Sequence, residues 1–406
     1  MTSSTPSAPQ CMAVEAWRVP TKEEMRAHLD SIRVKIDRTK HAKSQQLPSI
    51  LAVRQHQIPV DVYCYLKTRF GEPNGFQNWL REDSSDNLVH WDFMLKAGTQ
   101  DVYISGTNRQ IHFVLSERLT DEDWRNLILK IKTDFKRVGK AKSAVMDSLK
   151  KWVIFPNKFV PVANLCADLH SEILDNIGGF QTYKPSRNRL QVKTLDRLTH
   201  RSTKLYRACL ELSLITPVMA EAFINMVILI LCKRQIKDNP RQFEAFIRSA
   251  IDTKVFDLSY KCERFVKPID QTTMTYKNFK RVMDKRNHAI HGNIDPEKEQ
   301  IEMVYFEGKI PLFKRSGDHI GQFLEASEKR HQPETVIKDY ENTYEFLLEI
   351  VACLDPGAVT AFWEIMEHAY PGYELGRKIT GRLFPDYVTA SYLQGLRYDD
   401  ELAVNW

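Results

Sequence analysis

The sequence lacks paired-cysteine motifs and the common nucleotide-binding and catalytic signatures. Its seven cysteines are scattered, odd in number and without a C-x-x-C pair. This excludes a zinc ribbon and a disulfide framework, and indicates the reduced thiols of an intracellular protein. The P-loop, the dinucleotide fingerprint, the zinc-protease helix and the serine-hydrolase elbow are all missing. We therefore expect no cofactor and no metal. The nearest metal candidate, Asp83 and Asp86 with His90, is interpreted as a polar loop.

The chain also lacks a strong compositional bias, a secretory leader and an apolar run long enough to cross a membrane. It has 406 residues, 43% hydrophobic and 27% charged, with a net charge of +6. These values exclude a fibrous or wholly disordered protein and favour two or three globular domains. So small a surplus of positive charge permits a polyanionic partner but does not require one. The longest apolar run, residues 218–232, would span about 22 Å as a helix, short of a ~30 Å hydrocarbon layer. We expect a buried core helix there, in a soluble cytoplasmic protein with no membrane partner.

The N-terminal part of the chain predicts a small α+β domain. Residues 1–20 are rich in Ser, Thr and Pro, and we expect a disordered tail. Residues 21–155 open with a capping box, Thr21 with Glu24, and continue with short strands separated by glycine-bearing turns. The expected strands are residues 88–95, 101–105 and 110–115. Thr120 then caps a further helix.

From residue 160 to 370 the helical period dominates, and many of the segments begin or end at Pro or Gly. Helices are expected at residues 162–177, 194–214, 217–233, 240–251, 255–267, 275–291, 335–354 and 358–368. A β-hairpin is expected within 300–313, around Glu307-Gly308. Residues 371–406 form a C-terminal extension without a clear period. The predicted fold is therefore mostly α, a helical bundle with a smaller N-terminal α+β domain.

One segment at the end of the helix 275–291 gathers groups able to cleave RNA without a metal. It reads KRNHAIHGN, residues 285–293, and contains Arg286, Asn287, His288 and His291. A guanidinium binds phosphate through paired hydrogen bonds, and an imidazole transfers protons near neutral pH. One group can move the proton of the 2′-hydroxyl or of the leaving oxygen while the other stabilises charge on the phosphorus. The competing interpretation is a cationic last turn that stabilises the helix through its dipole.

The spacing sets a geometric condition on this hypothesis. Residues five apart on a straight helix point about 140° away from each other. Arg286 and His291 can therefore converge only if the last turn distorts or if a second chain contributes.

The pattern Arg286-Asn287-x-x-x-His291-Gly292, closing a helix in an all-helical region, resembles the HEPN superfamily over residues of about 195–355. Arg286 and His291 match the family signature, and Asn287 matches its polar companion. The first long helix of such bundles often carries an acidic residue that faces the pocket, and Glu221 is our candidate; structural pairing with a neighbouring arginine is the alternative. A second match, Arg281 with His288, overlaps the first but lacks the adjacent Asn.

The resemblance implies a homodimeric helical bundle and a metal-independent endoribonuclease, in members that act as toxins, as antiphage abortive-infection effectors or in RNA processing. Under this hypothesis His291 performs acid–base chemistry, Arg286 neutralises the phosphate, Asn287 fixes the geometry and His288 assists. The products carry 2′,3′-cyclic phosphate ends, and an antitoxin or trigger protein is a possible partner. The alternatives are a non-catalytic HEPN-like module that binds RNA, nucleotide or protein, and a scaffold in which the motif occurs by chance.

A second feature is a basic strip that begins in the helix following Thr120. Residues 130–151 include eight basic residues and only two acidic ones, Asp134 and Asp147. Such a strip can follow a phosphate backbone, although a solvated helix face is the competing interpretation. The predicted RNA-binding residues are Lys130, Lys132, Lys136, Arg137, Lys140 and Lys142.

Overall fold

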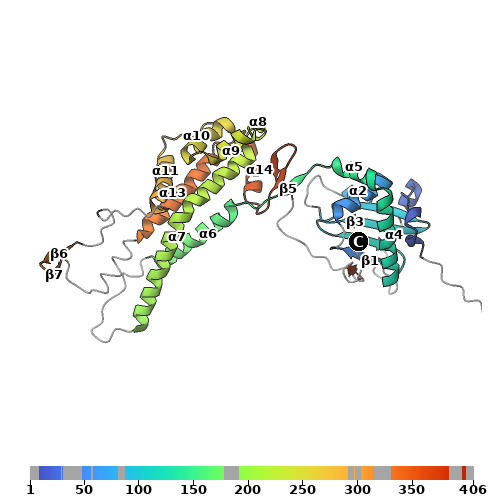
Figure 1. The fold of residues 1–406 in the computed structure, drawn as a ribbon, viewed down its shortest axis with the longest axis horizontal. Helices are drawn as coiled ribbons and strands as arrows, with labels where there is room; N and C mark the ends of the chain where they lie inside the picture. Colours follow the sequence, from blue (N-terminus) through green and yellow to red (C-terminus); the bar gives the residue numbers. More distant parts are fainter. Residues whose placement is uncertain are drawn as a thin grey trace, which may run out of the picture. The chain divides into compact units, whose positions relative to one another are not determined.

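The computed structural model divides the chain into two compact units (Figure 1). The first comprises residues 1–150 and 383–406, and the second comprises residues 151–382. The structure describes residues 9–28, 30, 48–55, 58–80, 87–177, 192–290, 297, 303–314, 331–383 and 396–398, apart from the side chains of 192–195, 287–290 and 396–398.

The first unit is built on a five-stranded sheet in the order β10-β1-β4-β3-β2. The strands are β1 (Ser49–Val53), β2 (Trp91–Ala97), β3 (Gln100–Gly106), β4 (Ile111–Leu115) and β10 (Leu396–Tyr398). All neighbouring strands are antiparallel except β1 and β10, which are parallel. The meander expected between residues 88 and 115 is therefore confirmed as β2, β3 and β4.

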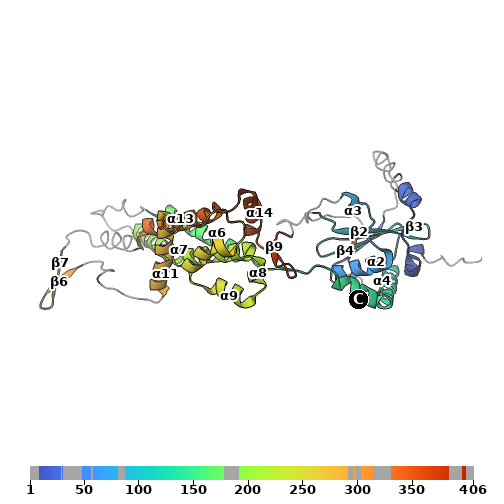
Figure 2. The ribbon, with the colours of Figure 1, turned by 90° about the horizontal axis from the view of Figure 1, so that it is seen from above.

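Helices lie on both faces of this sheet. They are α2 (Pro59–Phe70), α3 (Gln77–Leu80), α4 (Asp121–Arg137) and α5 (Gly139–Asp147). Figure 2 shows α2 and α4 on one face and the short α3 on the other. Alternate residues of β4, such as Phe113, join Trp124 and Leu127 of α4 in the core. The predicted capping box at Thr21 is formed with Glu24, and Thr120 caps its helix as predicted, through a capping box with Asp123.

The prediction of a disordered tail is wrong for residues 9–20. Two short 3-10 helices, Gln10–Met12 and Val14–Ala16, pack on the first unit. Cys11, Val14 and Trp17 are at most 3% exposed, and the indole N–H of Trp17 donates to the carbonyl of Cys11 at 3.0 Å. The bias toward Ser, Thr and Pro is confined to the first nine positions, and the apolar residues that follow are buried. Residues 1–8 lie outside the described residues.

Both ends of the second unit also differ from the expected boundaries. The division falls after Lys150 rather than at 155. β5 (Trp152–Ile154) pairs with β8 (Gly372–Glu374), which in turn pairs with β9 (Ile379–Gly381). The expected C-terminal extension is thus split, because β8 and β9 belong to the second unit whereas β10 completes the sheet of the first. Strands of three residues are too short to show a period in the sequence.

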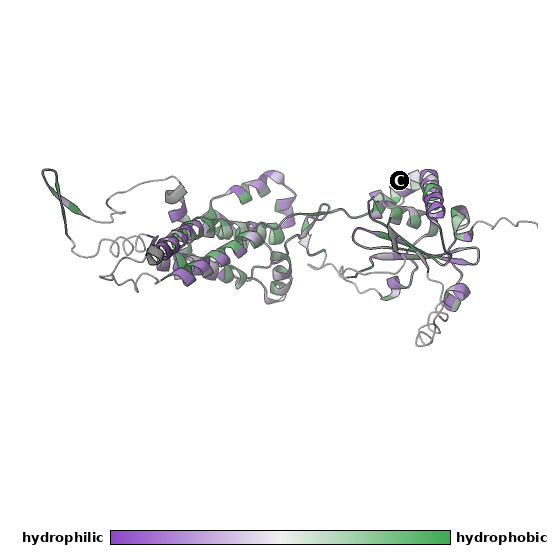
Figure 3. Ribbon diagram, turned by 90° about the horizontal axis from the view of Figure 1, so that it is seen from below, coloured by the Kyte–Doolittle hydropathy of each residue, from purple (hydrophilic) through white to green (hydrophobic). Residues whose placement is uncertain are grey.

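Apart from one hairpin, the other elements described in the second unit are helices, which confirms that the protein is mostly α. Its helices are α6 (Phe159–Asn176), α7 (Val192–Leu231), α8 (Arg234–Lys237), α9 (Pro240–Arg248), α10 (Ile251–Lys261), α11 (Met274–Ile290), α13 (Pro333–Val351) and α14 (Pro356–Met366). Hydrophobic residues of α6, α7, α11 and α13 form one continuous core (Figure 3). The expected hairpin is confirmed as β6 (Val304–Glu307) and β7 (Ile310–Phe313), whose turn uses Gly308 at φ +62°.

α7 is one helix where two were predicted, because Pro217 does not interrupt it. The Thr216 hydroxyl donates to the carbonyl of Leu212 at 2.7 Å, and Leu212, Met219 and Ala220 are completely buried around the proline. Packing of this face outweighs the ~3 kcal/mol that an internal proline costs a helix.

α7 is much longer than the apolar run 218–232, so its length must be compared again with the thickness of a membrane. The segment Asp196–Leu231 is long and apolar enough to cross a membrane by length and composition, with a mean hydropathy of 2.2 over 18 residues. Half of that window is buried within the unit. Its buried side chains, including Phe223 and Ile228, are part of the core, as predicted for residues 218–232. The helix therefore serves as the core helix of the bundle.

Candidate functional site

Three helices of the second unit bring four polar residues together. Glu221 and Asn225 lie one turn apart on the same side of α7, Lys254 lies on α10, and Arg286 lies near the end of α11. Lys254 Nζ is 3.1 Å from Glu221 Oε1 and 3.0 Å from Asn225 Oδ1. Arg286 Nη1 is 3.4 Å from Glu221 Oε2. We call these four residues the Glu221 cluster.

Burial makes the pairing inside the Glu221 cluster necessary. The side chain of Lys254 is 2% exposed, whereas that of Glu221 is 38% exposed. An ammonium without a partner costs several kcal/mol to bury, so Glu221 and Asn225 make the position of Lys254 possible. The cluster contains two cations and one carboxylate, which leaves it with a surplus of one positive charge. A partly exposed site of this kind attracts an anion.

Arg286 is the member of the cluster with unused hydrogen-bonding capacity. Its side chain is 28% exposed, and its contact with Glu221 is long for a charge-assisted hydrogen bond. Its Nε is buried and has no hydrogen-bond partner within the described parts of the chain. The fork of the guanidinium can therefore accept an oxyanion without first losing a strong protein contact.

The neighbouring basic residues of α11 are held differently. Arg281 Nη2 lies 2.9 Å from Asp339 Oδ1, and Lys285 Nζ lies 2.7 Å from Asp339 Oδ2. Asp339 belongs to α13, so both cations are matched by a carboxylate outside the Glu221 cluster. The structure thus separates the two overlapping sequence matches, because Arg286 faces Glu221 and Arg281 faces Asp339.

The predicted site residues are only partly covered by the described chain. The structure brings the side chains of Glu221 and Arg286 into contact. Asn287 and His288 follow in the last turn of α11, but their side chains lie outside the described residues, and so does His291, directly after the last helical residue. The convergence of Arg286 with His291 therefore stays a prediction.

Sequence reasoning missed two members of the cluster. Asn225 carried a usable signal, since it and Glu221 are the only polar residues in the run 218–232 before its final cysteine. Lys254 carried none, because its partner lies 33 positions away and no spacing rule connects them. For the metal candidate, Asp83 and Asp86 lie outside the described residues, and the described residues contain no group of three His, Cys, Asp or Glu able to hold a metal ion.

The basic strip of the first unit is partly used by the fold. The ammonium of Lys130 donates to the carbonyl of Met12 at 2.9 Å. Arg137 and Lys142 each lie 2.6 Å from a carboxylate oxygen, of Asp134 and Asp61 respectively. The remaining members, Lys132, Lys136 and Lys140, lie on α4 and α5, and the last two are exposed. Nucleic-acid binding by the strip stays a prediction, carried mainly by the exposed pair.

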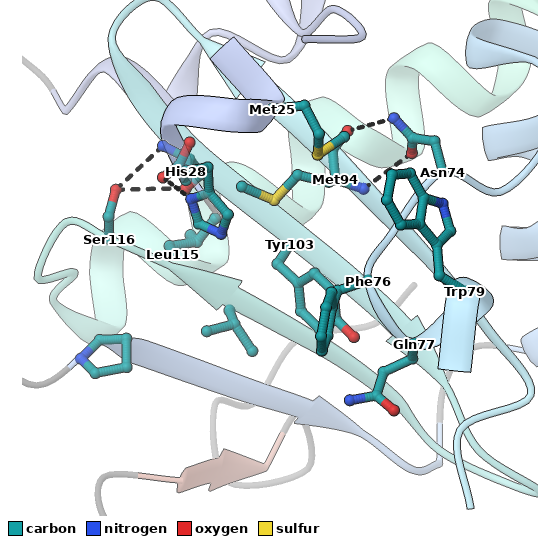
Figure 4. Close-up of a pocket in the computed structure, with 13 residues that line it drawn as sticks. Met25, His28, Asn74, Phe76, Gln77, Trp79, Met94, Tyr103, Leu115 and Ser116 are labelled. Carbon is teal, nitrogen blue, oxygen red and sulfur yellow. Dashed lines mark hydrogen bonds and ion pairs between the residues drawn. The ribbon is translucent and has the colours of Figure 1, made fainter. Parts of the chain in front are cut away.

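A cavity of about 440 Å³ lies on the opposite face of the same sheet, between the helix that begins at residue 22 and α3 (Figure 4). Met25 and Met94 line it with Phe76, Trp79 and Tyr103. In Figure 4, Phe76 stands against Tyr103, and Trp79 stands beside the strand that carries Met94. Trp79 is 67% exposed and Phe76 is 45% exposed, although both are large aromatic side chains. No sequence motif marks this cavity.

A buried carboxylate holds α3 in place beside the cavity. Asp92 of β2 accepts hydrogen bonds from the backbone N–H of Gln77 at 2.8 Å and of Asn78 at 2.9 Å, and from the Tyr103 hydroxyl at 3.0 Å. Burial is the main cause that raises the pKa of Tyr103, so the hydroxyl stays protonated and donates. Gly75 permits the approach, because a Cβ there would lie 2.2 Å from Asp92 Oδ2. These bonds therefore fix the backbone of α3, which carries Trp79, relative to the sheet.

A charged group closes the other end of the cavity. Asp101 lies 3.0 Å from Nδ1 of His28 and 2.6 Å from Nζ of Lys96. Burial raises the pKa of Asp101, but the hydrogen bonds with His28 and Lys96 outweigh it and bring the pKa below its ordinary value. This end of the cavity is therefore polar, whereas the wall near α3 is aromatic.

Comparison with known proteins adds no further constraint on either site. No family model, no curated protein and no solved structure matches this chain. The two features that bear on function are therefore the sequence pattern that ends α11 and the geometry of the Glu221 cluster.

Proposed function

We propose that the protein is a metal-independent endoribonuclease of the HEPN type, acting in the cytoplasm as a toxin or an antiphage effector. The contact between Glu221 and Arg286 carries this proposal. It joins the acidic residue of the long core helix to the arginine of the R-N-x-x-x-H pattern, two residues chosen from separate features of the sequence. The partial exposure of the Arg286 side chain, 28%, and its long contact with Glu221 support a phosphate as the ligand.

In the proposed mechanism the attacking group is the 2′-hydroxyl of the RNA itself, which is already positioned next to the phosphate. His291 transfers the proton, either from this hydroxyl or to the leaving 5′-oxygen. Arg286 binds the phosphate oxygens and stabilises the charge that develops on them. Asn287 and His288 assist by hydrogen bonding. The products are a 2′,3′-cyclic phosphate and a 5′-hydroxyl.

The rest of the Glu221 cluster positions the arginine. Lys254 lies against Glu221, and Glu221 holds one side of the Arg286 guanidinium while its exposed part faces the ligand. We further propose that two copies pair through the helical unit, so that their Arg286 and His291 side chains line a shared cleft. Residues five apart diverge on a straight helix, and pairing of two copies removes the need for Arg286 and His291 of one chain to converge.

Cleavage of RNA by the purified protein in the presence of EDTA tests the proposal. We expect the wild-type chain to cleave a mixed RNA sample and the His291→Ala variant to leave it intact, because the variant has lost its proton-transfer group. Gel analysis of labelled RNA provides the measurement. Cleavage by both proteins at the same rate would contradict the proposed site. Binding without cleavage would instead favour a non-catalytic module for RNA or nucleotide.

We also propose that the cavity of the first unit selects the substrate by holding an unpaired base. An exposed tryptophan beside Phe76, above an apolar floor, is the arrangement by which proteins stack single-stranded bases. A stacked base contributes ~1–3 kcal/mol, so Trp79→Ala should weaken binding of single-stranded RNA by about 5- to 150-fold. Fluorescence anisotropy of a labelled oligonucleotide measures this effect.

Leu80 provides the matched control for this experiment. It neighbours Trp79 on α3, is 61% exposed and does not line the cavity. Leu80→Ala should leave the affinity within about twofold, because it removes a similar exposed apolar group outside the cavity. Equal affinities for Trp79→Ala and the wild type would remove the cavity from substrate selection without affecting the Glu221 cluster.

A further inference from the structure

Two cysteines of the second unit lie directly opposite each other. Cys232 follows the end of α7, Cys262 follows the end of α10, and the two residues form an isolated antiparallel bridge. They are 5% and 2% exposed. They belong to neither the Glu221 cluster nor the cavity of the first unit.

The register of this bridge suits a disulfide. The backbone N–H groups of Lys233 and Glu263 donate across the bridge at 3.0 and 2.8 Å, one on each side of the cysteine pair. The cysteines therefore occupy a non-hydrogen-bonded pair, in which opposite Cα atoms are about 4.5 Å apart and the side chains are close. Disulfides join Cα atoms about 4.4–6.8 Å apart, so this backbone can accept the bond without rearrangement.

The pKa values of the two thiols change in opposite directions. Hydrogen bonding with Cys262 and then the charge of Lys237 bring the pKa of Cys232 below its ordinary value, although burial opposes the change. The same hydrogen bonding raises the pKa of Cys262. The geometry also lets the Cys232 S–H donate to the carbonyl of Lys233, at 3.8 Å. Lys261 adds to the favourable field at Cys232, and Glu263 opposes it. The pKa values of the other five cysteines, all buried, are raised. Cys232 is therefore the expected nucleophile.

We propose that Cys232 and Cys262 form a reversible disulfide when the protein meets a peroxide. The Cys232 thiolate attacks one peroxide oxygen, which forms an S–O bond and breaks the O–O bond, with release of hydroxide. The sulfur of Cys262 then attacks the sulfur of the Cys232 sulfenic acid, the S–S bond forms and the S–O bond breaks, and the sulfenic oxygen leaves as water with the proton of the Cys262 thiol. The two thiols lose two electrons in total and the peroxide gains them. A thiol reductant reverses the reaction.

The bond would join two of the three helices that build the Glu221 cluster. α7 carries Glu221 and Asn225, and α10 carries Lys254. Oxidation would therefore fix the ends of both helices and stabilise the second unit. Any effect on RNA cleavage rests on the proposed function, whereas the bond and its effect on stability do not.

Peptide mapping of the full-length protein tests the proposal. The reduced protein is treated with hydrogen peroxide under native conditions, alkylated and digested with trypsin. We expect peptide 208–233 linked to peptide 262–264. Because the first peptide also contains Cys209, the same link must form in the Cys209→Ser variant, which is the matched control. Absence of the linked peptide from both proteins, or its loss on replacing Cys209, would overturn the proposal.

The melting temperature gives a second readout. Closing a loop of about 30 residues should raise it by roughly 5–10 °C on oxidation, and dithiothreitol should reverse the rise. The Cys262→Ser variant should show no rise and should accumulate a sulfenic acid at Cys232, detectable with dimedone. A rise of the same size in Cys262→Ser would contradict the assignment of the pair.

Discussion

Replacing Arg286 with alanine is expected to reduce RNA cleavage by at least about 100-fold while leaving the fold intact. The loss follows because a positioned donor to the charged phosphate typically contributes this much to the rate. The fold should tolerate the change, since the side chain is 28% exposed and Glu221 keeps its contact with Lys254. Initial rates with labelled RNA and a thermal melt provide the two measurements.

Arg281 offers a matched control on the same helix. It is likewise a partly exposed arginine, but it pairs with Asp339 instead of Glu221. Arg281→Ala should keep cleavage within about threefold of the wild type, since it alters only a surface ion pair. If Arg281→Ala abolishes cleavage and Arg286→Ala does not, the overlapping Arg281/His288 match is the functional one. Equal losses would indicate a general effect of charge.

Arg286→Lys tests the geometry of the guanidinium separately from its charge. Lysine keeps the positive charge but cannot bind two phosphate oxygens through a planar fork. We expect this variant to retain RNA binding and to lose most of its cleavage activity. Full activity would show that only the charge at this position matters.

The second large effect concerns stability and depends on which member of the buried pair is removed. Glu221→Leu should lower the free energy of unfolding by roughly 3 kcal/mol, because it leaves the ammonium of Lys254 buried with only the amide oxygen of Asn225. Partial exposure of Glu221 admits some water, which places the expected cost at the low end for such pairs. Urea denaturation of the two proteins measures the difference.

Lys254→Met is the complementary variant and should cost less than about 1 kcal/mol. It removes the buried charge and fills the same space with an apolar chain, while Glu221 keeps Arg286 and its contact with solvent. We therefore expect a lower free energy of unfolding for Glu221→Leu than for Lys254→Met. A greater loss for Lys254→Met would contradict the electrostatic account of the cluster.

Local rules predicted the elements whose stability is local. The capping box at Thr120 and the hairpin around Gly308 are both present, since each depends on residues within a few positions. The proline rule failed at Pro217, where the buried faces on both sides hold the helix together. The tail prediction failed for a related reason, because the burial of Trp17 depends on contacts with distant parts of the first unit.

In the candidate site, too, the residues marked by a local sequence pattern were predicted, and the residue placed by tertiary contacts was not. Glu221 was identifiable as a carboxylate in an apolar helix, and Arg286 as part of a motif. Lys254 joins them only through the folding of α10 against α7, and no sequence spacing encodes that contact. The cavity near Trp79 was likewise not predicted, because it forms between α3, the helix that begins at residue 22 and one face of the sheet, and no spacing rule connects these segments.

The chemistry of the RNA ends tests the central claim most directly. RNA cleaved by the wild-type protein in EDTA should carry 2′,3′-cyclic phosphates and 5′-hydroxyls, because the 2′-hydroxyl is the proposed nucleophile. These ends should be absent after treatment with Arg286→Ala or His291→Ala. Products with 3′-hydroxyl ends, or cyclic phosphates that persist in both variants, would contradict the account.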